Sequence, residues 1–181
     1  MAMSEETIFS EPIFKGRVVE LSRDTVLLED GRQTTREVIH HLGGVCVAAF
    51  DAQDNLLMVR QFRYPYKAQL LELPAGKREP GEDPAECGRR ELEEETGTRA
   101  EIFRPLGRLY PTPAYVDEII YMYYAKKLSY TQQNLDEGEF LTVERVPFSQ
   151  AVEMVLAGEI LDAKTQIAVL KLSQLRARGE A

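Results

Sequence analysis

Hydrophobic and polar positions divide the chain into short strand-like runs, one central helix and a helical C-terminal end. Runs rich in Val, Ile and Leu predict strands at 13–21, 25–28, 33–41, 45–50, 56–62, 69–74, 100–110, 117–125 and 140–146. Amphipathic spacing predicts helices at 147–156 and 160–175, with Asp162 as a cap of the second. Residues 1–11 are polar and are expected to fray. This order predicts an α+β fold, an α/β/α sandwich around a mixed sheet, with a small N-terminal antiparallel sheet.

The segment 76–98, GKREPGEDPAECGRRELEEETGT, predicts the central helix. Asp83 is suited to the N-cap and Pro84 to the first helical position, and Gly97 is suited to a left-handed C-cap. The face that we expect to pack inward is formed by Ala85, Gly88 and Leu92.

Another face of this helix is acidic. It carries Glu91, Glu94 and Glu95, and Glu82 precedes it in the loop. Like charges at i and i+4 cost about 0.2–0.5 kcal/mol on a bare helix, whereas a divalent cation such as Mg²⁺ or Mn²⁺ prefers carboxylate oxygens as ligands. Most Glu-rich helix faces are simply solvated. Here the glycines, the Arg90-Glu91 step and the spacing favour a metal site.

Length and charge narrow the class of protein. The 181 residues predict an N-terminal β segment at 1–42 and one further domain at 43–181. A formal net charge of −8 argues against nucleic acid or an anionic membrane as the main partner. The N-terminal residues lack the basic and apolar regions of a signal peptide, and no run of about 20 apolar residues occurs. We therefore expect a cytoplasmic protein with Cys46 and Cys87 as reduced thiols, a disulfide between them being the lesser alternative.

The acidic helix resembles the Nudix box, the signature of Nudix hydrolases. The matching positions are Gly76, Glu82, Arg90, Glu91, Leu92, Glu94, Glu95 and Gly97. Thr98 stands where the family has an aliphatic residue. Seven matches fixed in identity make a chance match very improbable.

The resemblance extends along the chain to the bacterial ADP-ribose pyrophosphatase subgroup, through IFKGRVVEL, VRQFRYP, LLELPAGK, DEIIYMYYA and DAKTQIAVLKL. The subgroup has a proline about fifteen residues beyond the box, and Pro113 occupies that position. Its neighbours Thr112 and Ala114 depart from the usual Ser and Gly.

The resemblance implies a metal-dependent hydrolase that converts ADP-ribose and water to AMP and ribose 5-phosphate. The implied cofactor is Mg²⁺, with Mn²⁺ as the alternative. It also implies a homodimer in which the N-terminal strands are exchanged between subunits. An isolated sheet of this size has little core of its own, so we expect it to lie on the main domain or on a second subunit.

Roles for single residues follow from the resemblance. The implied metal ligands are the Ala75 carbonyl, Glu91, Glu95 and Glu139. Glu139 is the expected base or second metal ligand, and Glu94 a further ligand or orienting group. Structural roles are expected for Gly76, Glu82, Arg90 and Gly97. Substrate contacts are expected from Arg36, Glu37, Arg63, Glu72, Pro113 and Glu118.

Two other functions remain open on the sequence. One is a different nucleotide-sugar pyrophosphatase, for example one acting on GDP-mannose. The other is a non-catalytic nucleotide sensor built on the same fold. The complete set of box carboxylates argues against a sensor, because a sensor has no need for catalytic carboxylates.

Overall fold

The computed structural model describes residues 3–180, which form two compact units. One unit comprises the described residues up to Gly43 together with Tyr110–Ile119. The other comprises Gly44–Leu109 and the described residues from Ile120 onward. The sequence pattern did not indicate that Tyr110–Ile119 belongs with the N-terminal strands. Within the described residues, no helix is long and apolar enough to cross a membrane.

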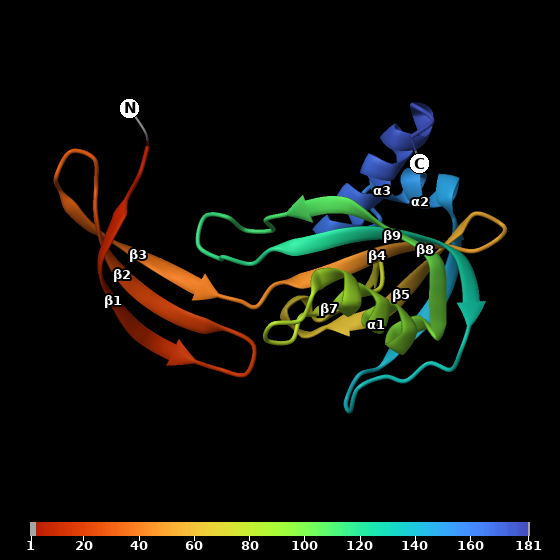
Figure 1. The fold of residues 1–181 in the computed structure, drawn as a ribbon, viewed down its shortest axis with the longest axis horizontal. Helices are drawn as coiled ribbons and strands as arrows, with labels where there is room; N and C mark the ends of the chain where they lie inside the picture. The colour runs from red at the N-terminus through yellow and green to blue at the C-terminus, as the bar shows by residue number, and fades with distance from the viewer. Residues whose placement is uncertain (1–2, 181) are drawn as a thin grey trace. The chain divides into compact units, whose positions relative to one another are not determined.

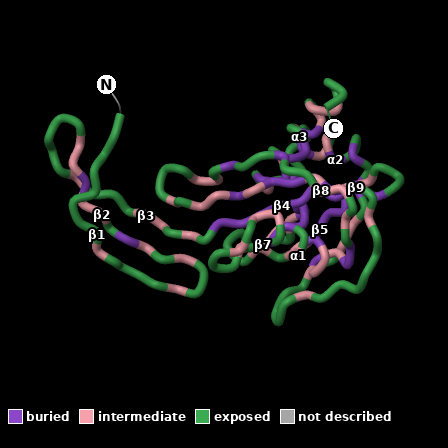
Figure 2. The backbone as a smooth tube through the Cα atoms, in the orientation of Figure 1, coloured by how far each residue is buried: buried purple, intermediate pink, exposed green. Residues whose placement is uncertain are grey.

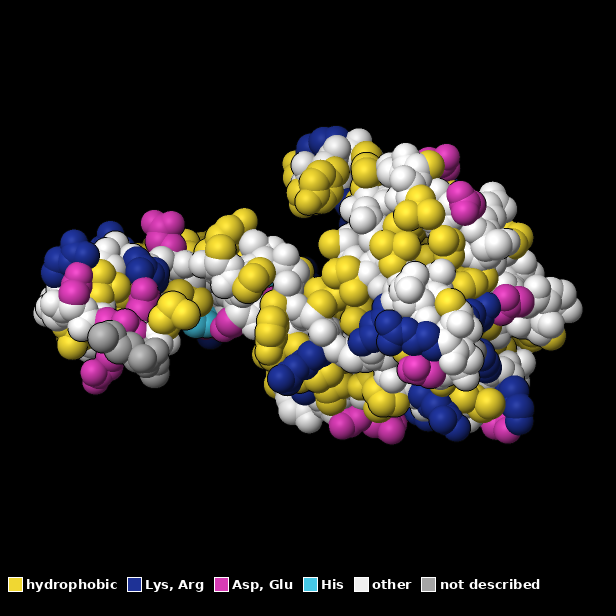
Figure 3. Space-filling view, turned by 90° about the horizontal axis from the view of Figure 1, so that it is seen from above, with side chains coloured by type: hydrophobic (Ala, Val, Ile, Leu, Met, Phe, Trp, Pro, Cys, Tyr) yellow, Lys and Arg dark blue, Asp and Glu magenta, His cyan; other side chains and the backbone are white. Residues whose placement is uncertain are grey.

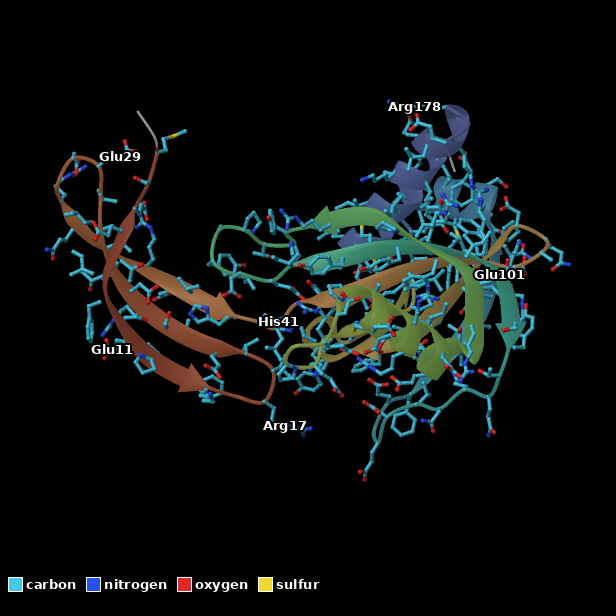
Figure 4. The ribbon with its side chains drawn as sticks, viewed as in Figure 1. Glu11, Arg17, Glu29, His41, Glu101 and Arg178 are labelled. Carbon is cyan, nitrogen blue, oxygen red and sulfur yellow. The ribbon has the colours of Figure 1, made fainter. Side chains whose placement is uncertain are left out.

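The first unit is built on a three-stranded antiparallel sheet of β1 (Glu6–Lys15), β2 (Glu20–Leu27) and β3 (Gln33–His40), in that order. Gly31 adopts a φ of 81° in the β2–β3 turn, where the sequence predicted one, and Glu29 lies at this turn (Figure 4). Arg17 lies in the turn between β1 and β2 (Figure 4).

Two predictions for the N-terminal region were wrong. The polar residues expected to fray belong in part to β1, because Glu6 to Glu11 pair along β2 and Arg23 bonds the Glu11 carboxylate. The single strand predicted at 13–21 is two strands joined by a turn, which the bond from Gly16 N to Val19 O closes. Met1 and Ala2, which the fraying prediction also covered, lie outside the described residues.

The second unit contains a seven-stranded mixed sheet and three α-helices (Figure 1). The sheet order is β10-β5-β4-β9-β8, with β6 beside β5 and β7 beside β4; β4 and β9 are parallel and the other pairs are antiparallel. Its elements are β4 (Gly44–Phe50), β5 (Asn55–Arg63), the 3-10 turn Tyr64–Tyr66, β6 (Ala68–Glu72), β7 (Ala75–Lys77), α1 (Pro84–Thr96), β8 (Thr98–Leu109), β9 (Ile120–Tyr130), β10 (Leu141–Pro147), α2 (Phe148–Leu156) and α3 (Ala163–Ala177).

Strand β4 is buried along its length (Figure 2), and its side chains contribute to two separate core clusters. Its side chains alternate: Val45 and Val47 pack with Leu92 of α1, whereas Cys46 and Ala48 pack with residues of α2 and α3. All seven residues of β4 are buried, as its unbroken apolar run predicts. The α+β sandwich with a mixed sheet and a small N-terminal sheet is therefore confirmed.

The strand predicted from residue 117 starts three residues later, at Ile120. Asp117 is used instead as a hydrogen-bond acceptor within the first unit. Its carboxylate accepts from His41 N at 2.8 Å and lies 2.6 Å from His40 Nδ1. The backbone of this segment also pairs with β3, because Asp117 N donates to Ile39 O at 3.1 Å.

Candidate active site

Helix α1 begins and ends where the sequence predicts. The Asp83 carboxylate accepts from Ala85 N at 2.8 Å and from Glu86 N at 3.3 Å, and Gly97 closes the helix with a φ of 62°. A Cβ at Gly97 would also lie 2.8 Å from Gln133 N, so glycine is required there for space as well as for conformation. Gly88 and Leu92 are buried, as the predicted inward face requires.

Arg90 lies at the centre of the acidic face. Its Nε bonds Glu82 Oε1 at 3.0 Å, and its Nη1 lies 2.8 Å from both Glu91 Oε1 and Glu94 Oε2. The bonds from Arg90 are the main cause that lowers the pKa of Glu82 to about 2. One guanidinium therefore offsets the repulsion among three carboxylates.

Glu91 and Glu95 contact the backbone of β7. The Glu91 carboxylate packs so closely on Gly76 that a Cβ there would lie 1.9 Å from its carbon. Glu95 is only 4 % exposed, and its Oε2 accepts from Ala75 N at 2.8 Å. The glycine that opens the box thus makes room for a carboxylate.

The environment of these two carboxylates favours a cation. Burial, aided by the charges of Glu94 and Glu139, raises the pKa of Glu91 to about 7 despite Arg90. Burial, aided by the charges of Glu91 and Glu139, raises the pKa of Glu95 to about 8. Closely placed, partly desolvated oxygen ligands fit a hard divalent ion. Among residues 3–180, no three acidic, His or Cys side chains are arranged to hold one. Instead, Arg90 Nη1 lies 2.8 Å from Glu91 Oε1, and Ala75 N donates to Glu95 Oε2.

Glu139 lies in the loop between β9 and β10. It is exposed, and its charge raises the pKa of both Glu91 and Glu95, so the structure brings it to the same acidic cluster. The loop is attached to the C-terminal end of α1: Gln133 Nε2 bonds Glu95 O at 2.6 Å, and Asn134 N bonds Glu94 O at 3.0 Å. The sequence pattern showed an acidic loop but gave no sign of these attachments.

Arg63 and Glu72 form a bidentate ion pair with distances of 2.6 and 2.8 Å. Glu72 is buried, and it also pairs with Lys164, which the sequence analysis did not single out. A buried amide, Gln61 Nε2 in β5, has no hydrogen-bond partner among the described residues. Both residues lie in segments that carry the resemblance, VRQFRYP and DAKTQIAVLKL, but nothing in those segments indicated an ion pair for Lys164 or burial for the Gln61 amide.

The other predicted substrate residues lie in the first unit. Arg36 bonds Glu5 with distances of 3.0 and 2.6 Å, and Glu37 beside it on β3 is exposed. Pro113 is exposed in the segment between β8 and β9. Glu118 Oε1 lies 3.3 Å from His41 Nδ1. Their contribution to a site with the second unit stays a prediction.

Three curated relatives match between 78 % and 93 % of the chain. An ADP-ribose pyrophosphatase of Bacillus subtilis (strain 168) is 39 % identical over 93 % of this chain and 92 % of its own length. A methanol dehydrogenase activator of Bacillus methanolicus is 42 % identical, covering 91 % and 90 %. A GDP-mannose pyrophosphatase of Shigella flexneri serotype 5b (strain 8401) is 34 % identical, covering 78 % and 77 %.

A solved structure and a family model support the same fold and family as these relatives. A solved structure described as an ADP compounds hydrolase superposes with a TM-score of 0.86 at 20 % identity over 100 % of both chains, and it supports the fold. The NUDIX domain family matches residues 40–166, a range that holds the box, the Arg90 cluster and the loop with Glu139. The chain belongs to the Nudix hydrolase family.

Proposed function

We propose that this Nudix hydrolase cleaves the pyrophosphate bond of ADP-ribose to give AMP and ribose 5-phosphate. The observation that carries the chemistry is the pair of partly desolvated carboxylates, Glu91 and Glu95, held against the backbone of β7. The choice of substrate is supported by the 39 % identical relative that is named for this activity.

The residues fit a divalent metal, for which we propose Mg²⁺, with Mn²⁺ as the alternative. Its ligands would be Glu91, Glu95, Glu139 and the carbonyl oxygen of Ala75. When bound, such an ion supplies charge neutralisation on the pyrophosphate and a lowered pKa of water. Arg90 would release part of its contact with Glu91 and keep Glu82 and Glu94 as partners.

The chain itself would supply the proton acceptor and the orientation of the substrate. Glu139 is exposed on a loop attached to α1, so its carboxylate is accessible to take the proton from the attacking water. Glu94, bonded to Arg90, would orient the cluster. The positive charge of Arg63 lies close enough to Glu95 to offset part of the rise in the pKa of Glu95 that burial causes. In the proposed site, Arg63 would bind the anionic substrate.

We also propose a cytoplasmic homodimer that exchanges its N-terminal strands. Strand β1 exposes a set of large apolar side chains, and hydrophobic atoms are visible on the surface of the N-terminal unit (Figure 3). The exposed set is Ile8, Phe9, Ile13 and Phe14. Such a surface favours burial against another chain. In such a dimer, this unit would contact the substrate through Arg36, Glu37, Pro113 and Glu118.

The two cysteines bear on the compartment. Cys46 and Cys87 are both free and buried, which fits the reducing conditions of the cytoplasm.

A second candidate is hydrolysis of another nucleotide sugar. The 34 % identical relative named GDP-mannose pyrophosphatase supports it, as does Ala114, which replaces the Gly common in the ADP-ribose subgroup.

A substrate panel tests the proposal. Turnover of ADP-ribose, GDP-mannose, UDP-glucose, NADH and 8-oxo-dGTP would be measured by chromatographic separation of the products, with Mg²⁺, with Mn²⁺ and with chelator. We expect ADP-ribose to be preferred and chelator to abolish turnover. Preference for GDP-mannose would support the second candidate, faster turnover of 8-oxo-dGTP would refute both, and no turnover of any compound would favour a sensor.

A further inference from the structure

A network of four charges joins the start of α3 to the end of β5. Glu72 of β6 is 1 % exposed and binds two cations. Its Oε1 accepts from Arg63 Nε at 2.6 Å, and its Oε2 accepts from Arg63 Nη2 at 2.8 Å and from Lys164 Nζ. Both carboxylate oxygens are therefore engaged by protein groups.

Lys164 is fixed on its other side by Asp162. Lys164 is 9 % exposed, and its Nζ lies 2.8 Å from Asp162 Oδ1. The second oxygen of Asp162 accepts from Thr165 N at 2.9 Å and so caps α3. Burial lowers the pKa of Lys164, but Asp162 and Glu72 outweigh it and raise the pKa, so the ammonium stays charged.

A helix cap alone would not need Lys164. Asp162 and Thr165 already close the N-terminus of α3, and Thr165 Oγ1 ties that end to Leu73 N at 2.9 Å. A buried lysine is costly unless its charge is compensated, and replacing a buried ion pair with apolar residues is often neutral for stability. The contact of Lys164 with Glu72 is thus a feature that anchoring the helix does not explain.

Arg63 is the one member of this network that solvent reaches substantially. Its side chain is 38 % exposed, whereas that of Glu72 is 1 % exposed. The bonds to Glu72 engage Nε and Nη2 and so fix the plane of the guanidinium. The bonds to Glu72 are the main cause that raises the pKa of Arg63, and the charge of Glu95 adds to the rise, so the guanidinium lies within electrostatic range of this α1 carboxylate.

We propose that Lys164 is a positioning residue that holds Glu72 and thereby fixes Arg63 for the anionic substrate. The proposal rests on the proposed function, in which Arg63 meets the anionic substrate. Lys164 itself touches no substrate. Without it, Glu72 keeps one cationic partner in place of two, and its carboxylate with the attached guanidinium gains freedom to rotate.

A double-mutant cycle tests whether Lys164 acts through Arg63. The kcat and KM for ADP-ribose would be measured for the wild type, Lys164→Met, Arg63→Ala and the double variant. We expect Lys164→Met to lower kcat/KM about tenfold, mainly through KM, but less than about twofold when Arg63 is already absent. Lys171→Met, an exposed lysine of the same helix, is the matched control and should match the wild type. Equal losses in both backgrounds would overturn the proposal.

A second measurement needs no substrate. In ¹⁵N–¹H NMR spectra, the Nε–H signal of Arg63, assigned by its loss in Arg63→Lys, should exchange with water about tenfold faster in Lys164→Met than in the wild type. If Lys164→Met does not fold, Lys164→Gln, which keeps a donor without the charge, should show the same direction. Unchanged exchange would refute the positioning role. A wild type that turns over no compound refutes the proposed function alone, since the exchange rate still decides how Arg63 is held.

Discussion

At the scale of single residues, the site depends on the absence of a Cβ atom at Gly76. Gly76 leaves the space that the Glu91 carboxylate occupies, and a Cβ would lie 1.9 Å from its carbon. Gly76→Ala must therefore displace Glu91 or shift β7. We expect it to lower the free energy of unfolding by about 1–3 kcal/mol. It should also lower kcat by at least about tenfold, which corresponds to a rise of about 1.4 kcal/mol in the activation barrier.

Thermal unfolding and steady-state kinetics check this prediction. Lys77→Ala, at an exposed neighbour in the same strand, is the control and should change neither quantity much. Wild-type turnover in Gly76→Ala would mean that the position of Glu91 does not matter for catalysis.

Glu95 offers a test of the metal ligands themselves. Glu95→Gln keeps the shape of the side chain and an oxygen that can accept from Ala75 N, so the fold should persist. The loss of a charged ligand should lower kcat at least about a hundredfold, because the cation contributes several kcal/mol to catalysis. Circular dichroism and turnover with saturating Mg²⁺ would measure both. Exposed Glu86 on the same helix supplies the control, Glu86→Gln, and retained activity in Glu95→Gln would remove Glu95 from the ligand set.

Residues whose role is set by their neighbours in sequence were predictable. Asp83 and Gly97 act through adjacent backbone groups, so their positions in the chain were enough to place both ends of α1. Lys164 was missed because its partner Glu72 is 92 residues away, and only the folded sheet brings the two together. The unpartnered amide of Gln61 was missed for the same reason, since burial of one atom depends on the whole core.

At the scale of elements, α1 and the loop before it share one ion pair. Arg90 of the helix bonds Glu82 of the loop and lowers its pKa to about 2 from a usual 4.5. The folded pKa lies below the unfolded one, so the unfolded chain binds more protons between these values. The stability that Glu82 contributes is therefore present above about pH 4.5 and is lost as the pH falls toward 2.

Glu82→Gln removes this titration. At pH 7 we expect it to lower the free energy of unfolding by about 1–3 kcal/mol, the typical value of a hydrogen bond to a charged group. Between pH 4.5 and 2 its stability should fall less steeply than that of the wild type. Urea unfolding across this range measures both effects, with the exposed Glu79→Gln as control. Parallel pH profiles for wild type and Glu82→Gln would show that Arg90 does not hold Glu82 ionised.

Element boundaries were less predictable than element types. The unbroken run of β4 and the helical spacing of α2 and α3 identified these elements, because a buried strand and an amphipathic helix need particular residues throughout. The turn at Gly16 was missed since its flanking residues, Phe14 and Val18, are as apolar as a strand interior. Both side chains are exposed, so the apolar character of these residues does not mean that they are buried within this chain.

At the scale of the whole molecule, the two units differ in how well they bury their apolar residues. The second unit holds two packed clusters on the faces of its sheet, whereas β1 exposes most of its large apolar side chains. Phe9 is 62 % exposed and Phe14 is 58 % exposed. Full burial of such a side chain contributes about 1.5–3 kcal/mol, so leaving both in water forgoes a substantial stabilisation.

A dimer that buries β1 would recover this stabilisation and can be tested directly. Phe9→Glu combined with Phe14→Glu removes two apolar contacts and adds charge, so it should weaken self-association at least about a hundredfold, corresponding to about 3–6 kcal/mol. Sedimentation velocity at micromolar concentration should show the wild type as a dimer and the double variant as a monomer. Thr7→Glu, an exposed polar position of the same strand, should remain dimeric. If Arg36 and Glu37 reach a substrate only within the dimer, the double variant should also show a raised KM for ADP-ribose, with its second unit still folded. A monomeric wild type would refute the strand exchange, and a dimeric double variant would place the interface elsewhere.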